Sequence, residues 1–227
     1  MSISVALAAY NGGRYIREQV DSILCLLGDD DEIVISDDNP SGDTRAALAD
    51  IGDSRVRYIE GKGEGVVSNF ENALRSCRGE YIYLCDQDDV WMPGKVKKTR
   101  AEFEKGAFLV LHNAEITDAS LNPTGRTCFE LYNTNTGLIR NLIRNSFVGC
   151  CMAFRREILD DILPFPDRLP MHDWYIGLIS IKKGYKIALI DEPLIKWRRH
   201  ADNVTGRATS LGQKIRFRIK MIGYLFP

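Results

Sequence analysis

The sequence contains no uninterrupted apolar stretch approaching the roughly 18 residues that a membrane-spanning helix needs. Its 227 residues carry a net charge of only −1, with no excess of basic residues that would favour nucleic-acid binding. No basic leader followed by an apolar run opens the chain, so we expect no signal peptide. There is also no internal repeat and no low-complexity linker. We therefore expect one large domain, soluble or peripheral to a membrane.

Cysteine is present, but not at the spacings of a zinc or redox site. The six cysteines form no C-x-x-C pair, and no histidine stands at zinc-finger spacing. Cys25, Cys77 and Cys85 fall in apolar-periodic segments, where a thiol packs as a small hydrophobe. Cys150 and Cys151 would point to opposite faces if they lie on a strand. We expect all six to be reduced core or near-core thiols of a cytoplasmic protein.

The first half of the chain alternates strands with helices. The expected strands are 2–9, 32–36, 56–59 and 80–85. The expected helices are 16–27, 43–49 and 66–77, and we expect Asn11 to cap the first of them. Short connections between alternating elements indicate a parallel sheet with right-handed crossovers.

The second half is less regular. We expect helices at 93–105, 136–144 and 174–183, with Pro93 in the first turn of its helix. Strands are expected at 107–112, 147–154, 185–190 and 194–197, and a hairpin or surface loop at 118–127.

The most informative feature is the acidic run Asp86-Gln87-Asp88-Asp89, which directly follows a buried strand. Three carboxylates crowded at a strand end repel one another and are hard to keep ionised without a cation. Hard oxygen ligands suit Mg²⁺ or Mn²⁺, usually with substrate phosphates completing the shell. The alternative is a solvated acidic turn; the strand before the run and the Trp91–Pro93 turn after it favour the metal site.

Two other strands also end in polar groups, Ala9-Tyr10-Asn11 and Asp37-Asp38. In a parallel sheet these groups and the acidic run share the edge where ligands of open α/β sheets bind. A stacking aromatic, acceptors for a base or ribose, and a metal for phosphates describe a nucleoside-diphosphate site. Neither G-x-x-x-x-G-K-[ST] nor G-x-G-x-x-G follows the first strand, so we expect metal rather than a glycine loop to hold the phosphates.

Five stretches, spread over nearly the whole chain, together resemble glycosyltransferase family 2. They are VALAAYNG at 5–12, ISDD at 35–38, RGEYI at 78–82, DQDDVW at 86–91 and MHDW at 171–174. The resemblance implies an α/β GT-A fold, with a Rossmann-like, mostly parallel sheet and a smaller acceptor-side subregion in the second half. It implies metal-dependent transfer of a sugar from a nucleoside-diphosphate donor, with inversion at the anomeric carbon.

Within the family, the form of these stretches and of Arg198-Arg199-His200 most resembles rhamnosyltransferases and related polysaccharide-building enzymes. This implies dTDP-rhamnose or a UDP-hexose as donor, and a glycan or lipid-linked acceptor. On this basis residues 1–210 form a single domain. Residues 1–112 bind the nucleotide-sugar, 113–210 carry the acceptor and catalytic groups, and 211–227 form a basic-apolar terminal segment.

The resemblance also implies residue roles. Tyr10 and Asp37 would contact the nucleobase, Asp37 by accepting an imide hydrogen, with Ala9 and Asn11 beside them. Asp86 would help to hold the nucleoside or the metal. The main metal ligand would be Asp88, and His200 would join the metal or diphosphate shell. Asp173 corresponds to the general base. Contacts with the acceptor or the diphosphate would come from Trp91, His172, Trp174, Arg198 and Arg199.

Two departures from the family pattern affect these roles. Asp38-Asn39-Pro40-Ser41 stands where Asp-Asp-Gly-Ser is common, which puts contacts from that loop in doubt. His172-Asp173 stands where Glu-Asp is usual, which keeps the carboxylate of the base and changes its neighbour.

Several alternatives stay open at this point. A nucleotidyltransferase would share the metal and the nucleotide but release pyrophosphate, and a non-catalytic sugar-nucleotide-binding module would release nothing. Asp173 could cap the helix after it, and His172 is better suited to positioning than to carrying a proton. Trp91 and Trp174 could be core aromatics, and of Arg198 and Arg199 one could be solvated while the other faces the diphosphate.

The segment 214–226 interleaves four basic residues with apolar ones. As a helix it would spread its charges around the axis, so no clean amphipathic stripe is expected. It could lie on an anionic bilayer surface, or it could pack on the domain or on another subunit.

Overall fold

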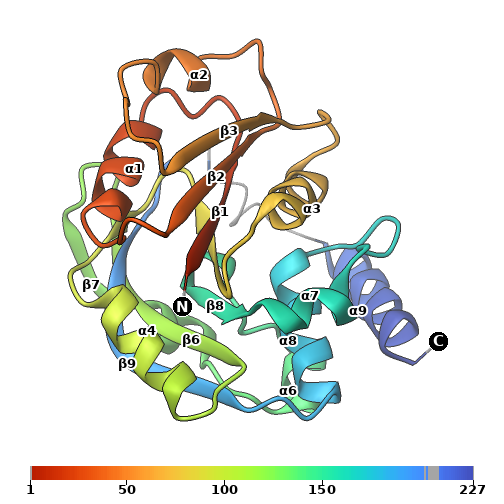
Figure 1. Ribbon diagram of the computed structural model, residues 1–227. Helices are drawn as coiled ribbons and strands as arrows, with labels where there is room; N and C mark the ends of the chain where they lie inside the picture. The colour runs from red at the N-terminus through yellow and green to blue at the C-terminus, as the bar shows by residue number, and fades with distance from the viewer. Residues whose placement is uncertain (1, 202, 204–209, 227) are drawn as a thin grey trace.

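The computed structural model describes residues 2–201, 203 and 210–226. Within them one sheet runs through the molecule in the order β3-β2-β1-β4-β8-β6-β9-β5, with β7 paired to β6 (Figure 1). The strands are β1 (Ile3–Ala9), β2 (Glu32–Asp37), β3 (Val56–Glu60), β4 (Tyr81–Asp86), β5 (Val90–Trp91), β6 (Leu109–Thr117), β7 (Pro123–Thr127), β8 (Met152–Arg155) and β9 (Ile187–Arg198). The helices are α1 (Ile16–Leu24), α2 (Thr44–Ala47), α3 (Val66–Ser76), α4 (Lys95–Glu104), α5 (Cys128–Tyr132), α6 (Leu138–Ile143), α7 (Leu159–Ile162), α8 (His172–Lys182) and α9 (Leu211–Leu225), with 3₁₀ turns η1 (Gly149–Cys151) and η2 (Arg156–Ile158).

Strand β1 lies at the centre of the parallel part of the sheet, and all seven of its residues are buried. Its neighbours β2 and β4 both run parallel to it, and β3 runs parallel to β2. Since successive side chains point to opposite faces, Ile3, Val5 and Leu7 pack in the core with α1 and α4. Ala6 and Ala8 pack in the second core, with α3, α7 and α8. The expected parallel sheet with helices on both faces is confirmed.

The chain leaves β1 toward β2 and β3 on one side and returns to β4 on the other. In open α/β sheets, ligands bind in the crevice outside the carboxyl ends of the strands where the order reverses in this way. In this sheet that position lies beyond the ends of β1 and β4. The other half of the sheet is mixed, since β8 is antiparallel to both β4 and β6.

The structure corrects several local predictions. Asn11 does not cap α1, because a turn intervenes in which the amides of Tyr15 and Ile16 both donate to the Gly12 carbonyl. Pro93 precedes α4, which begins at Lys95 after Gly94 in a left-handed conformation (φ 89°).

Three of the expected strands also differ. The expected strand 147–154 is a 3₁₀ turn followed by the short β8. The strand expected at 107–112 continues to Thr117. The two strands expected at 185–190 and 194–197 are one irregular strand, β9, with register shifts against β6 around Asn113. Such shifts allow a strand to bend without ending.

The six cysteines are all free thiols, as expected. Cys25 is exposed, at the end of α1, so the prediction of a core position is wrong for this residue. The other five are buried. Cys150 and Cys151 lie on the turn η1 rather than on a strand, and both pack in the same core.

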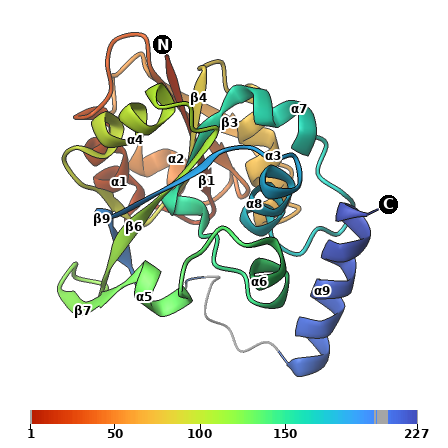
Figure 2. The ribbon, with the colours of Figure 1, turned by 90° about the horizontal axis from the view of Figure 1, so that it is seen from below.

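The terminal segment is a helix that packs on the domain. Met221 and Leu225 of α9 are fully buried in the core shared with α3, α7 and α8. Figure 2 shows α9 at the edge of the molecule, beside α6. No helix in the described ranges is long and apolar enough to cross a membrane.

Candidate active site

The carboxyl ends of three adjacent parallel strands bring the predicted polar groups together. Ala9 pairs with Asp37 across β1 and β2, and Ala8 pairs with Asp86 across β1 and β4. The acidic run, Tyr10 and the Asp37 segment therefore lie on one edge, as the sequence predicted.

Tyr10 is held at this edge through its backbone. The Gln87 side chain accepts a hydrogen bond from the Tyr10 amide (2.8 Å) and donates one to the Tyr10 carbonyl (3.0 Å). The Tyr10 side chain itself is 59% exposed. An aromatic ring fixed at its backbone and open to solvent is well placed to stack on a planar ligand.

Asn69 of α3, which the sequence analysis did not single out, also organises this edge. Its amide nitrogen donates to the carbonyls of Ala9 (3.0 Å) and Ser36 (2.9 Å) and so ties the ends of β1 and β2 together. No periodicity or spacing pointed to it, because its partners lie 60 and 33 residues away in the sequence.

The loop after β2 is ordered by its own polar groups. Asp37 is fully buried; its carboxylate accepts from the Tyr58 hydroxyl (2.7 Å) and the Asn39 amide (3.1 Å). Asp38 accepts from the amides of Gly63 and Gly65 and shapes the loop after β3. The Asn11 side chain accepts from Asn39 (2.8 Å), which links the ends of β1 and β2.

Asp88 and His200 are in direct contact. The Asp88 Oδ2 atom lies 2.8 Å from His200 Nε2 and accepts from Asn203 Nδ2 at 3.0 Å. The His200 ring also packs against Tyr15, with the ring centroids 4.8 Å apart. Two groups predicted to share a metal, 112 residues apart in the chain, therefore meet.

The acidic run is crowded, as its sequence indicated. Burial, together with repulsion from Asp88 and Asp173, raises the pKa of Asp86 to about 7. Burial also raises the pKa of Asp89, whose Oδ2 atom has no hydrogen-bond partner among the described residues. A divalent cation would relieve exactly this kind of repulsion between carboxylates, so the residues present fit a metal.

Two neighbouring ligand sets could hold the cation. Asp86, Asp89 and Cys150 offer ligand atoms within 4.8 Å of one another, and Asp88 with His200 forms the other set. The hydrogen bond with Cys151 and burial raise the pKa of the Cys150 thiol well above its ordinary value. A neutral thiol is a poor ligand for a hard cation, so of the first set only the carboxylates of Asp86 and Asp89 suit Mg²⁺ or Mn²⁺.

Beneath the acidic run lies a buried cation that the sequence analysis did not identify. Lys95 is fully buried; its Nζ atom donates to the Cys150 carbonyl (3.2 Å) and lies 4.0 Å from the centroid of the Trp91 ring. Burial lowers the pKa of its ammonium group, a shift that the nearby Asp89 carboxylate opposes, and the charge of Lys95 in turn lowers the pKa of Asp86.

Asp173 lies at the start of α8. Its carboxylate accepts from the Gly149 amide (3.1 Å) and from the Trp174 amide (2.6 Å). The N-cap of α8 is Met171, so Asp173 occupies the first turn rather than the cap. Burial raises its pKa to about 6.

His172, next to Asp173, is stacked on Phe70 with the ring centroids 4.0 Å apart. Burial lowers its pKa to about 3, which keeps the ring neutral. This agrees with a positioning role rather than a role in proton transfer.

Three of the weaker expectations differ from the geometry. Trp91 (3% exposed) and Trp174 (5%) are core aromatics, and the Trp174 indole donates to the Asn141 carbonyl (2.8 Å). Arg198 is also buried. Its guanidinium donates to the carbonyls of Asp88 and Ala119 and to Glu18, so it braces the acidic run instead of facing a diphosphate. Arg199 packs on the Trp197 ring.

A surface cavity of about 730 Å³ lies elsewhere, at the opposite edge of the sheet. It is lined by Tyr81 at the start of β4 and by Arg155 at the end of β8, and by none of the residues discussed above. Its lining also carries charged side chains, three of them arginines, but it holds neither the acidic run nor the ends of β1 and β2, so we do not assign the donor to it.

The model of the family described as glycosyl transferase family 2 matches residues 4–163 of this chain. The match contains the acidic run and the ends of β1, β2 and β4. The chain belongs to glycosyltransferase family 2.

The chain spans only part of the length of the two relatives described next. An uncharacterized glycosyltransferase of Nostoc sp. is 25% identical over 89% of the chain, which spans 66% of that relative. The UDP-Glc:alpha-D-GlcNAc-diphosphoundecaprenol beta-1,3-glucosyltransferase WfgD of Escherichia coli is 26% identical over 83% of the chain and 73% of its own length.

Solved structures show the same GT-A fold. TarS of S. aureus in complex with UDP-GlcNAc superposes with a TM-score of 0.71 at 17% identity, covering 99% of this chain and 66% of TarS. The mannosyltransferase PcManGT of Pyrobaculum calidifontis, in complex with GDP-Man and Mn²⁺, gives 0.63 at 21% identity, covering 96% of this chain and 64% of PcManGT.

The bridge made by Gln87 leads to a testable prediction. Gln87→Ala removes both hydrogen bonds that fix the Tyr10 backbone, each worth about 0.5–1.5 kcal/mol. We expect nucleoside-diphosphate affinity to fall about 5- to 150-fold, with a much smaller change in turnover at saturating donor. Calorimetric titration measures the affinity, and Gln213→Ala, at an exposed glutamine of α9, is the matched control. Unchanged affinity would show that Gln87 does not organise the site.

Proposed function

We propose that this chain is an inverting, metal-dependent glycosyltransferase that uses a nucleoside-diphosphate sugar as donor. The observation that carries the proposal is the meeting of Asp86, Asp88, His200 and Asp173 at the carboxyl edge of the parallel strands. Family membership and the GT-A fold support it, and family membership favours it over the nucleotidyltransferase alternative.

In this proposal Tyr10 and Asp37 bind the nucleobase, with Ala9 and Asn11 forming the floor of its site. Asp86, Asp88 and His200 hold Mg²⁺ or Mn²⁺ beside the diphosphate. The bound cation would stabilise, as a Lewis acid, the negative charge that develops on the leaving diphosphate. The mannosyltransferase structure with GDP-Man and Mn²⁺ supports a cation in this fold.

Asp173 is proposed to take the proton from the acceptor hydroxyl. The Asp173 carboxylate is held by two amides. Because its pKa is raised to about 6, it is ionised at neutral pH and is a stronger base than an ordinary aspartate. The Gly149 amide positions it, and the adjacent His172 is held against Phe70. A single displacement needs only this base, whereas retention by double displacement would need an additional nucleophile.

We further propose a role in cell-surface polysaccharide assembly, at the cytoplasmic side of the membrane. The acceptor would be a hydroxyl of a glycan or of a lipid-linked saccharide, in line with the diphosphoundecaprenol named for the Escherichia coli relative. The donor would be dTDP-rhamnose or a UDP-hexose.

A panel of nucleotide-sugars incubated with the protein and Mn²⁺ tests the activity. The expected result is slow, metal-dependent release of a nucleoside diphosphate from one donor, detected by chromatography, and faster release with the right acceptor. Release of pyrophosphate would indicate a nucleotidyltransferase instead. If a donor binds but no nucleoside diphosphate is released with any acceptor tested, a non-catalytic binding module would be favoured.

Tyr10 gives a prediction specific to the nucleotide. Tyr10→Ala should weaken nucleoside-diphosphate binding about 5- to 150-fold, because stacking of a base on an aromatic ring contributes about 1–3 kcal/mol. The melting temperature should stay unchanged, since the side chain is 59% exposed. Calorimetry and thermal unfolding measure the two quantities. Phe226→Ala, at an aromatic side chain that is 57% exposed, is the matched control and should bind normally; equal binding by Tyr10→Ala would contradict base stacking.

A further inference from the structure

Helices α6 and α9, which are in contact, each expose large apolar side chains. On α9 these are Leu211, Ile215, Ile219, Ile222 and Phe226 at its carboxyl end, between 46% and 76% exposed. On α6 they are Ile139 (73%) and Ile143 (62%). The two helices are in contact, and the Arg218 guanidinium of α9 donates to the Ile143 carbonyl. We call these seven side chains the α6–α9 face.

The spacing on α9 places the exposed residues on one stripe. Positions 211, 215, 219, 222 and 226 follow one another at intervals of four, four, three and four, which is the repeat of a single helix face. The partly buried Phe217 and the buried Met221 and Leu225 occupy a neighbouring stripe against the domain. The helix therefore has two apolar faces, of which the domain covers only one.

Helices α6 and α9 carry charge of one sign only. Arg140 on α6, and Lys214 and Arg216 on α9, are exposed cations, and no described carboxylate forms an ion pair with them. The sequence has no Asp or Glu between 131 and 156, and none after 202. An apolar stripe on helices that carry cations and no carboxylate is complementary to an anionic bilayer surface, where each Lys or Arg strengthens binding about fivefold.

The same face adjoins the proposed base. The Trp174 indole, next to Asp173 on α8, donates to the Asn141 carbonyl of α6. One layer of helix therefore separates Asp173 from the apolar face.

From these observations we propose that the α6–α9 face binds the surface of an anionic lipid bilayer. The apolar side chains would insert at the level of the headgroups and the flanking cations would contact acidic lipids. The proposal does not depend on the proposed glycosyl transfer, and it defines a surface of the folded domain rather than an isolated tail.

Co-sedimentation with vesicles tests the proposal. We expect the wild-type protein to bind vesicles of phosphatidylcholine with phosphatidylglycerol, to bind pure phosphatidylcholine much more weakly, and to be released by salt. The triple variant Ile215→Ser, Ile219→Ser, Ile222→Ser should lose binding by about tenfold or more. Lys214→Glu with Arg216→Glu should lose binding to the anionic vesicles selectively. These positions are preferred to truncation, because removing α9 would uncover the core around Met221 and Leu225.

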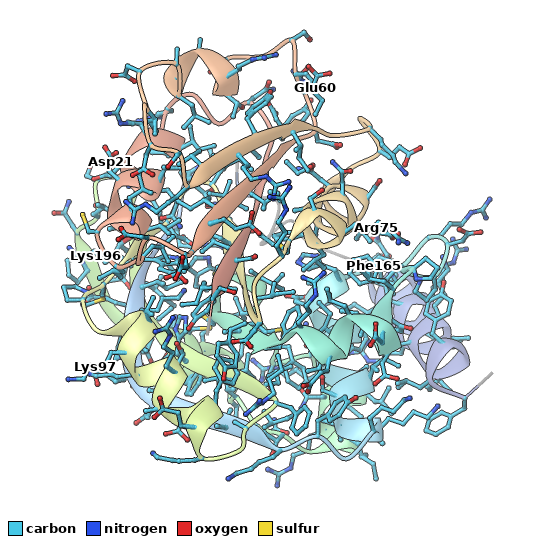
Figure 3. The ribbon with its side chains drawn as sticks, in the orientation of Figure 1. Asp21, Glu60, Arg75, Lys97, Phe165 and Lys196 are labelled. Atoms are coloured by element: carbon cyan, nitrogen blue, oxygen red, sulfur yellow. The ribbon has the colours of Figure 1, made fainter. Side chains whose placement is uncertain are left out.

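A double variant provides the matched control. Leu189→Ser removes an exposed leucine of β9 (42%), and Lys97→Glu reverses an exposed lysine of α4 that points away from the molecule on the side remote from α9 (Figure 3). It should bind like the wild type. Thermal unfolding checks that all variants fold, and donor hydrolysis without vesicles should be the same in all of them.

Three results would overturn the proposal. One is no binding of the wild type to anionic vesicles. Another is an equal loss in the control variant. The third is a dimer of the wild type, seen by sedimentation velocity, that becomes a monomer in the triple variant while the wild type binds no vesicles. A second copy of the chain would then cover the α6–α9 face. Failure of donor hydrolysis in every variant, with vesicle binding intact, would reject the proposed function and leave this inference standing.

Discussion

Replacing Asp88 with alanine is expected to abolish sugar transfer and to remove the metal dependence of donor binding. The Asp88 carboxylate is the partner of His200 and Asn203 and the proposed main ligand of the cation. Without it the diphosphate loses its counter-charge. Calorimetric titration of a nucleoside diphosphate, with and without Mn²⁺, measures the effect directly, and transfer is followed as released nucleoside diphosphate.

Two further variants make this test specific. Asp88→Asn keeps an oxygen that can accept from Asn203 but removes the charge, so it should be as inactive as the alanine variant. Asp30→Ala removes an exposed carboxylate at the far end of β2 and should behave as wild type. If Asp88→Asn still binds the nucleoside diphosphate in a metal-dependent way, Asp88 has a structural role and is not a ligand of the cation.

Asp173→Asn is expected to leave donor binding nearly intact while turnover falls roughly 10²–10⁴-fold, the usual scale for loss of a general base. The Gly149 and Trp174 amides donate to different oxygens of Asp173, so asparagine keeps only one of these two hydrogen bonds, and thermal unfolding checks that the variant is folded. Steady-state kinetics with calorimetry separates the two quantities. Asp160→Asn, at an exposed acid of α7, is the control. Turnover within a factor of a few of the wild type would place the base elsewhere.

The pH dependence provides an independent test of the same residue. Burial raises the pKa of Asp173 to about 6, and only its ionised form accepts a proton. The rate should therefore fall as the pH drops through about 6, and this acid limb should be absent from the residual activity of Asp173→Asn. The measurement requires saturating Mn²⁺, because Asp86, with a pKa of about 7 in the absence of cation, titrates nearby.

The parallel half of the fold was predictable because its signals are local. Strands β1, β2 and β4 are short apolar runs that end in polar groups, and α3 carries apolar residues at helical spacing. Parallel strands share a carboxyl edge whatever lies between them. The gathering of Tyr10, Asp37 and the acidic run therefore followed from the order of elements alone.

The mixed half was less predictable because its pairing is set by contacts distant in the sequence. Strand β9 follows the bends of β6, and η1 replaces half of an expected strand where Gly149 meets Asp173. No local periodicity reports a register shift, so the sequence divided β9 into two strands.

The sequence by itself determined the chemistry available to this protein, namely which carboxylates, histidine and aromatic ring follow which strands. Tertiary structure decided which of them face the ligand edge. It assigned Arg198 to internal hydrogen bonds, buried Trp91 and Trp174, and recruited Gln87 and Asn69 from 77 and 60 residues away. It also decided that the domain covers only one of the two apolar faces of α9. The physical reason is that residue type and spacing are encoded locally, whereas burial and hydrogen-bond partners depend on which elements come to lie against each other.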